Sequence, residues 1–282
     1  MVKLPEISRH SCLAIQDEST ARRFFSFGGI EPEAEPEGGL LARLCFVFSG
    51  IPFENLTKII KSKRVISAAS AKRKPDELIS DFLDYGTGGT CFSLTAACTA
   101  LVRFLGFEAA PILADRHYGT DTHSALLIFQ DSDLFLLDPG YLIHEPCRLP
   151  VNSPLTVKRD FNDLELVPRA GGKLVDLYTL AGRSRKLRLT YKISPLDDSS
   201  YSRAWERSFA WEMMTYPVLT RCYQGEHQYL QGNLLRCRDR EKGSKQVLSA
   251  REQHSFITSV LGINSGIVQE AFQCVGQSST LR

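Results

Sequence analysis

Residues 86–94 read GTGGTCFSL, and they place three glycines and two threonines directly before a cysteine. A long apolar run follows, in which residues recur at helical spacing until Gly106, where a C′ glycine would end a helix. The recurring residues are Leu94, Cys98, Leu101, Val102 and Leu105. Cys91 is therefore predicted to lie in the first turn of a buried helix.

A cysteine at the start of a helix has two interpretations. Unpaired backbone N–H groups and the positive end of the helix dipole favour the thiolate form. The glycines let a substrate carbonyl approach the backbone, where the N–H of Cys91 could stabilise an oxyanion. A cysteine after glycines can equally be a packed core residue behind a flexible turn, so other residues must decide between a nucleophile and a buried thiol.

A histidine and an aspartate follow on two apolar segments that are predicted to pair as a hairpin. DTHSALLIF brings His123 to the start of one strand, and LFLLDPG brings Asp138 to the end of the next. A two-residue loop at Gln130-Asp131 puts His123 opposite Asp138, and a four-residue loop puts Asp138 opposite Ala125. Both registers keep the two side chains on one face, about 5 to 8 Å apart at Cβ.

An aspartate beside an imidazole fixes its tautomer, and such an imidazole can take the proton from a thiol. Each residue also has a structural alternative, since His123 could cap a strand and Asp138 could start the turn with Pro139. The order Cys, His, Asp, with the last two adjacent, favours a catalytic triad of Cys91, His123 and Asp138.

The composition is that of an ordinary globular protein. Over 282 residues, 43% are apolar and 23% charged, which suffices for two or three packed subdomains. A net charge of +2, without a basic cluster interleaved with aromatic residues, argues against a nucleic-acid partner. Eight cysteines without a CxxC or HExxH motif are expected to be reduced thiols, with no metal site.

Membrane and export signals are not evident in the N-terminal sequence. The apolar run at 40–48 is far shorter than the roughly 20 residues that span a bilayer. MVKLPEISRH has no apolar segment after its lysine. A cytoplasmic protein without a membrane partner is expected, and the sequence leaves its oligomeric state open.

Helical patterns dominate the first part of the chain. EPEAEPEGG at 31–39 is predicted to be a connector, and 40–48 a short apolar helix. Residues 58–74 carry seven Lys/Arg and no acid, a pattern typical of a solvated face and less often of a phosphate site.

The rest of the chain changes to strands and then to a mixed pattern. Residues from 111 to about 195 read as short strands between polar turns. From Ser199 helical and strand patterns alternate, and Ser249 with Glu252 forms a capping box for a last helix through Ser259.

At this point the sequence resembles the arylamine N-acetyltransferases over most of its length. The resemblance implies an α+β fold with a cysteine-protease-like core: an N-terminal helical domain over 1–110, a central antiparallel β-barrel over 111–197 and a C-terminal α/β lid over 198–282. The matching segments are IPFENL at 51–56, GGTCFSL around Cys91, LGF at 105–107, THSALL around His123 and LLDPGY around Asp138.

The resemblance implies a nucleophile at Cys91, a base at His123 and an orienting carboxylate at Asp138. Phe53 and Tyr141 match aromatic positions of the family's acceptor pocket, although either could be a core aromatic. An acetyl group would pass from acetyl-CoA, the donor substrate, to an arylamine-type acceptor, without a permanently bound cofactor.

The chain departs from the family's RGGxCxExN pattern. Thr87 replaces the Arg, Ser93 the Glu and Thr95 the Asn. The family's Arg is expected to pair with the Glu of PFEN, so Glu54 lacks its partner unless a distant Arg replaces it. The same Cys-His-Asp order also serves a transglutaminase-like or protease-like hydrolase, and the three changes leave open a relative that keeps the triad without catalysis.

Overall fold

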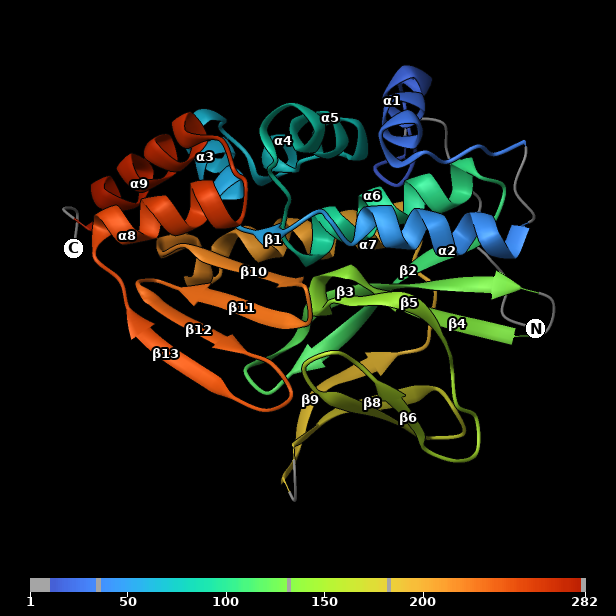
Figure 1. The fold of residues 1–282 in the computed structure, drawn as a ribbon. Helices are drawn as coiled ribbons and strands as arrows, with labels where there is room; N and C mark the ends of the chain where they lie inside the picture. Colours follow the sequence, from blue (N-terminus) through green and yellow to red (C-terminus); the bar gives the residue numbers. More distant parts are fainter. Residues whose placement is uncertain (1–10, 34–36, 131–132, 182–183, 280–282) are drawn as a thin grey trace.

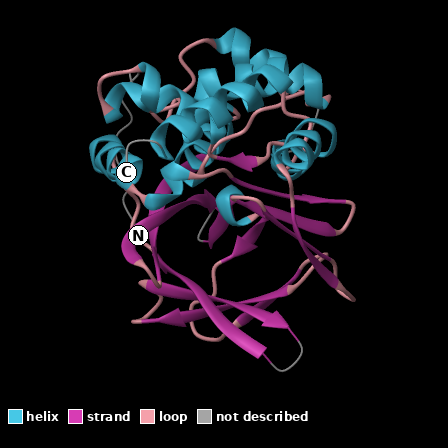
Figure 2. Ribbon diagram, turned by 90° about the vertical axis from the view of Figure 1, so that its left-hand side faces the viewer, coloured by secondary structure: helices cyan, strands magenta, loops and turns pink. Residues whose placement is uncertain are grey.

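The computed structural model describes residues 11–33, 37–130, 133–181 and 184–279. The fold is α+β, with helices gathered on one side and two antiparallel sheets on the other (Figures 1 and 2). The predicted fold class is confirmed.

Helices fill most of the chain as far as residue 104. They are α1 (Glu18–Gly28), α2 (Glu37–Phe48), α3 (Leu56–Arg64), α4 (Ala68–Ala71), α5 (Pro75–Tyr85) and α6 (Cys91–Phe104). The side chain of Asp17 caps α1, which ends at Gly29 in the left-handed conformation. Helix α2 begins at Glu37, inside the predicted connector, because the last proline of that segment is Pro36 and nothing after it stops a helix.

Helix α6 matches its prediction at both ends. It begins at Cys91, and Gly106 follows its end with φ 89°. The N–H of Phe107 closes the helix on the carbonyl of Val102 at 3.2 Å.

The larger sheet has eight antiparallel strands that curl into a nearly closed barrel (Figure 2). Their order is β5-β4-β3-β2-β9-β8-β7-β6, so sequential hairpins are joined by the pairing of β2 with β9. Alternate residues such as Leu127, Leu136 and Leu177 fill the interior. The strands are β2 (Glu108–Arg116), β3 (Gly119–Gln130), β4 (Asp133–Asp138), β5 (Ile143–Arg148), β6 (Leu155–Lys158), β7 (Asp163–Arg169), β8 (Leu174–Ala181) and β9 (Ser184–Lys192).

The smaller sheet combines a strand from the helical region with four C-terminal strands. Its order is β1 (Phe53–Glu54), β10 (Val218–Tyr223), β11 (Glu226–Gln231), β12 (Leu234–Arg238) and β13 (Gly243–Val247). Helix α7 (Asp198–Arg207) and the 3-10 turns η2 (Ser208–Ala210) and η3 (Glu212–Thr215) lead into it.

Two C-terminal helices cover the smaller sheet (Figure 1). Helix α8 (Ala250–Ser255) carries the predicted capping box of Ser249 and Glu252, and a π-helical turn extends it to Val260. The sequence interpretation ended the last helix at Ser259 and missed α9 (Ser265–Ser279), which packs against α3. Among the described helices, none is long and apolar enough to cross a bilayer.

The PFEN and GGTC segments form one structural unit. Glu54 N–H donates to the carbonyl of Gly89 at 3.0 Å, and Gly89 N–H donates to the carbonyl of Pro52 at 3.3 Å. A Cβ at Gly88 would overlap the Pro52 carbonyl, so this close approach requires glycine. Because Phe53 also pairs with Thr220, this unit links the start of α6 to the smaller sheet.

Candidate active site

Cys91 is the first residue of α6, so its N–H lies outside the helical hydrogen-bond ladder. Its side chain is 6% exposed and lines a cavity between the two sheets. Gly140 sits directly against it: a Cβ there would lie 2.6 Å from Cys91 Cβ and 3.0 Å from His123 Cε1. Because glycine has no side chain, position 140 leaves space for the thiol of Cys91 and the imidazole of His123.

His123 and Asp138 lie side by side and are fully buried. His123 Nε2 is 2.6 Å from Asp138 Oδ2. Leu126 pairs with Leu137, which is the register expected for the four-residue loop rather than the two-residue one. The prediction that His123 and Asp138 share a face is confirmed.

Three donors hold the carboxylate of Asp138. Besides the imidazole, Tyr191 Oη donates to Oδ2 at 2.7 Å and Tyr141 N–H donates to Oδ1 at 2.9 Å. A buried carboxylate needs such partners, and they fix its direction toward His123. Tyr191 belongs to β9, far away in sequence, and sequence reasoning missed it.

The thiol and the imidazole have pKa values shifted in opposite directions. Burial raises the pKa of Cys91, but the charge and hydrogen bond of His123 and the cations of Arg116 and Lys58 bring it below the ordinary value. Burial lowers the pKa of His123, but the charge and hydrogen bond of Asp138 together with the charge of Cys91 outweigh it and raise the value. These shifts favour a thiolate beside an imidazolium, the ionic form of an activated cysteine.

Arg116 contacts the other ring nitrogen of the histidine. Its Nη2 lies 3.0 Å from His123 Nδ1, which in the neutral ring makes Nδ1 the acceptor and places the proton on Nε2, toward Asp138. Ala114 pairs with His123 across the β2–β3 ladder, and Arg116 lies two residues further along β2, so strand alternation places it on the face of the histidine. Sequence analysis missed Arg116 because it did not predict how β2 pairs with β3.

The cavity has a volume of about 890 Å³. Cys91 lies at its wall, and the predicted pocket residues Phe53 and Tyr141 both line it. Loops of the barrel supply one side, and Trp211, Met213 and Tyr216 supply part of the other. Within the described ranges, no group of three or more His, Cys, Asp or Glu side chains could hold a metal ion.

No family profile and no curated protein sequence matches the chain. Solved structures do match it over nearly its whole length. An arylamine N-acetyltransferase from Mycobacterium abscessus superposes with a TM-score of 0.77 at 18% identity, covering 97% of this chain and 99% of that one. The chain has the arylamine N-acetyltransferase fold.

Two further structures with this fold bear on the site. The Bacillus cereus arylamine N-acetyltransferase, described as having a unique Cys-His-Glu catalytic triad, matches at 16% identity with a TM-score of 0.68, covering 87% of this chain and 98% of its own. The Mycobacterium marinum arylamine N-acetyltransferase in complex with CoA matches at 17% identity with a TM-score of 0.70, covering 83% and 89%. The resemblance stated from the sequence motifs is thus confirmed for the fold.

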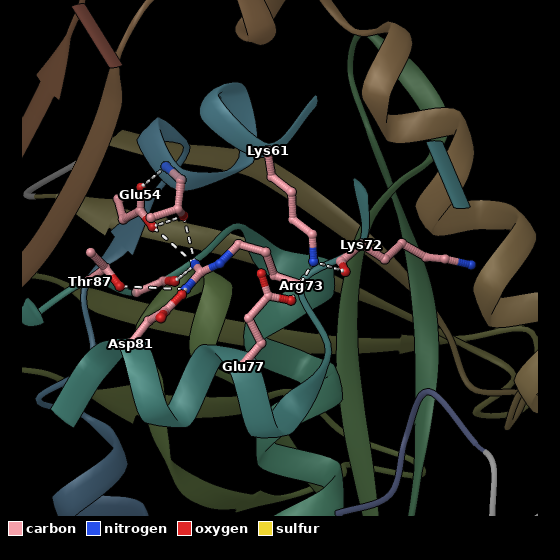
Figure 3. A network of polar contacts seen from close by, with 9 residues as sticks. Glu54, Lys61, Lys72, Arg73, Glu77, Asp81 and Thr87 are labelled. Atoms are coloured by element: carbon pink, nitrogen blue, oxygen red, sulfur yellow. Dashed lines mark hydrogen bonds and ion pairs between the residues drawn. The ribbon is translucent and has the colours of Figure 1, made fainter. Parts of the chain in front are cut away.

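Arg73 supplies the cation that the arylamine N-acetyltransferase motif places at position 87. Its Nη1 lies 3.4 Å from Glu54 Oε1 and 2.6 Å from Thr57 Oγ1, and it also contacts the carbonyl of Gly88 (Figure 3). Its Nη2 binds Asp81 at 2.7 Å and lies 3.5 Å from Thr87 Oγ1. Glu54 is fully buried, and this distant arginine replaces the missing partner.

The other two departures from the motif are also accommodated. Ser93 Oγ donates to the carbonyl of Thr90 at 3.1 Å. Thr95 Oγ1 donates to the carbonyl of Ser124 at 3.1 Å, next to His123 on β3. Thr95 therefore links helix α6, which begins at Cys91, to strand β3, which carries His123.

The Glu54 network predicts that Thr87→Arg lowers stability. Position 87 is buried and already faces Arg73, so a second guanidinium would bring like charge and excess volume into a filled site. We expect a loss of about 1 to 3 kcal/mol in the free energy of unfolding, measured by urea melts. Thr87→Val is the matched control for loss of the hydroxyl alone, and a Thr87→Arg protein as stable as wild type would contradict the network.

Cations of the basic segment 58–74 mostly serve the fold. Lys61 pairs with Glu77, Lys72 with Glu206 and Arg64 with Glu270. None of the segment's residues lines the 890 Å³ cavity in the described part of the chain.

Lys58 is a buried cation behind Cys91. Its Nζ donates to the carbonyl and hydroxyl of Ser208 at 2.9 and 2.6 Å and lies 4.4 Å from the centre of the Phe209 ring. It forms no ion pair with a carboxylate of the described residues. Burial lowers its pKa to about 7, and the neighbouring Cys91 opposes this shift.

Replacing Lys58 with methionine should stabilise the protein and change its pH dependence. Between about pH 7 and the unfolded lysine pKa of about 10.4, the unfolded chain binds more protons than the native protein, so wild-type stability gains with rising pH. We expect Lys58→Met to be more stable by about 1 to 4 kcal/mol at neutral pH. This advantage should shrink toward about pH 9, as measured by urea unfolding. If the difference in unfolding free energy between Lys58→Met and wild type did not change with pH, the lowered pKa of Lys58 would be contradicted.

Proposed function

We propose that this protein is an acyltransferase that carries an acetyl or similar acyl group on Cys91 from coenzyme A to an aromatic amine. The observation that supports it most is the contact of Cys91, His123 and Asp138 beside a cavity of about 890 Å³, within a fold shared with arylamine N-acetyltransferases. These three residues are the proposed catalytic triad.

In the first half-reaction, the Cys91 thiolate attacks the thioester carbonyl and forms a tetrahedral oxyanion. The N–H of Cys91, free at the start of α6, is a donor for this oxyanion. When the intermediate collapses, the C–S bond to coenzyme A breaks and the leaving thiolate takes the proton of the His123 imidazolium. The products are an acyl-Cys91 thioester and free coenzyme A.

In the second half-reaction, the amine attacks the acyl-Cys91 carbonyl and His123 takes its proton. The C–S bond to Cys91 breaks, which releases the amide and restores the thiolate–imidazolium pair. An aromatic amine suits this step because its low basicity keeps the nitrogen unprotonated near neutral pH. Phe53 and Tyr141 are the proposed aromatic walls for this acceptor, and both line the cavity.

The position of the cavity between the two sheets argues against a protease-like or transglutaminase-like reaction. Trp211, Val218 and Tyr229 line it together with barrel residues, whereas an extended peptide would need a groove along the surface. The lowered pKa of Cys91 argues against a relative that keeps the triad without catalysis. Cys12, Cys45, Cys91, Cys98, Cys147, Cys222 and Cys237 are free thiols, which suit a reducing compartment, so we place the reaction in the cytoplasm.

The test is the release of free coenzyme A from acetyl-CoA, with and without 4-anisidine as acceptor. We expect a burst of one equivalent without the amine and continuous release with it, together with the amide product. Continuous release that does not depend on the amine would identify a hydrolase and overturn the proposal.

A further inference from the structure

Four arginines line the part of the cavity beyond the triad. Arg159 follows β6, Arg188 lies on β9, and Arg236 and Arg238 lie on β12. We call these four residues the arginine wall. It combines the barrel with the smaller sheet, so no single sequence segment reveals it.

A chain of contacts connects the arginine wall to the nucleophile. Gly140 lies against Cys91, and the carbonyl of the next residue, Tyr141, accepts from Arg159 Nη1 at 3.1 Å. Arg159 and Arg238 lie 4.4 and 5.2 Å from the centre of the same Phe161 ring. Arg159 of the arginine wall therefore contacts the residue that directly follows Gly140, the glycine packed against Cys91.

The wall carries no internal counter-charge. Among the described residues, the side chain of Arg188 donates only to Thr179 and that of Arg236 only to Gln231, and Arg238 Nε is buried without a hydrogen-bond partner. None of the four forms an ion pair with a carboxylate of the described residues. By contrast Arg185, on the same strand as Arg188 but away from the cavity, pairs with Glu165 at 2.6 Å.

The positive potential of the wall acts on its neighbours. Burial together with Arg238 and Arg159 lowers the pKa of His227 to about 3. The cavity lining holds a single carboxylate, Glu212. Half-buried guanidinium groups that repel one another cost free energy, which a bound anion would recover.

We propose that the arginine wall binds the phosphate groups of the acyl donor and so selects phosphorylated thioesters over plain ones. This rests on the proposed acyl transfer at Cys91. Planar guanidinium groups from two sheets suit a ligand that carries several phosphate oxygens, and the 890 Å³ cavity is lined by both these arginines and Cys91.

The experiment compares acetyl-CoA with S-acetyl-pantetheine, which has the same thioester but no phosphates. The rate of Cys91 acylation is measured with each donor in wild type, Arg188→Gln, Arg238→Gln and the double variant. We expect the ratio of the two rates to fall about tenfold for each arginine, with a steeper loss at low ionic strength. Arg185→Gln is the matched control and should keep the wild-type ratio.

Calorimetric binding of coenzyme A to Cys91→Ala provides a readout that does not need acylation. Binding that weakens in the arginine variants by the same factor supports the proposal. Equal loss with both donors, or no loss with either, overturns it even if acyl transfer stands. If wild type takes no acyl group from either donor while coenzyme A binding still depends on the wall, the function fails and the binding site stands.

Discussion

Replacing Cys91 with alanine should abolish acyl transfer and leave the fold intact. The thiolate is the only proposed nucleophile, and its loss removes the covalent step rather than slowing it. Alanine is tolerated at the start of a helix, and the side chain fills little of the core. Turnover with acetyl-CoA and 4-anisidine measures the loss, and a thermal melt checks the fold.

Cys98→Ala is the matched control because Cys98 is a second buried cysteine on the same helix. Burial raises the pKa of the Cys98 thiol well above its ordinary value, so it is inert and its removal should leave turnover intact. Residual turnover in Cys91→Ala, with an acyl group on another cavity residue, would contradict the assignment of the nucleophile.

His123→Ala should lower kcat/KM by about 10²- to 10⁴-fold, and Asp138→Asn by less. Alanine removes the base altogether. Asparagine keeps an oxygen that accepts from Tyr141 N–H. Its NH₂ group, however, would face His123 Nε2 and Tyr191 Oη, which donate to Asp138 Oδ2 in the wild type. This disfavours the histidine tautomer with its proton on Nε2. Both effects are measured as steady-state rates on variants with native melting curves.

The pH dependence of thiol alkylation gives an independent readout of the same pair. His123 is the main group that lowers the pKa of Cys91 against burial, so His123→Ala should shift the alkylation midpoint to higher pH. Arg116→Met should shift it in the same direction by a smaller amount. An unchanged midpoint in His123→Ala would mean that the imidazole does not ionise the thiol.

Local patterns in the sequence correctly predicted that Cys91 begins a helix and that His123 lies beside Asp138. Three local signals predicted the bounds of α6: the glycines before Cys91, the helical spacing after it and the C′ position of Gly106. His123 and Asp138 share a face in the registers of both the two-residue and the four-residue loop, so the prediction did not depend on the loop length.

The residues that support the triad could not be predicted in this way. Tyr191 reaches Asp138 from β9, and Arg116 reaches His123 from the neighbouring strand β2. The arginine wall needs the smaller sheet to face the barrel. Each depends on pairing between distant segments, which periodicity does not encode.

The partner of Glu54 is another feature that the sequence pattern did not identify. The sequence indicated that Thr87 left a buried carboxylate without its family partner, and physical chemistry required a replacement. Which cation fills the role depends on the path of the chain between α4 and α5, which brings Arg73 to Glu54. The segment 58–74 thus contributes to the site through the buried ion pair of Arg73 with Glu54, and not through an exposed basic face.

The central claim, that Cys91 carries the acyl group, is tested most directly by intact-mass analysis after incubation with acetyl-CoA alone. We expect wild type to gain the mass of one acetyl group, located at Cys91 by peptide mapping and lost on addition of an aromatic amine. A protein that stays at its unmodified mass, or that carries the acetyl group elsewhere while Cys91 remains free, would contradict the account.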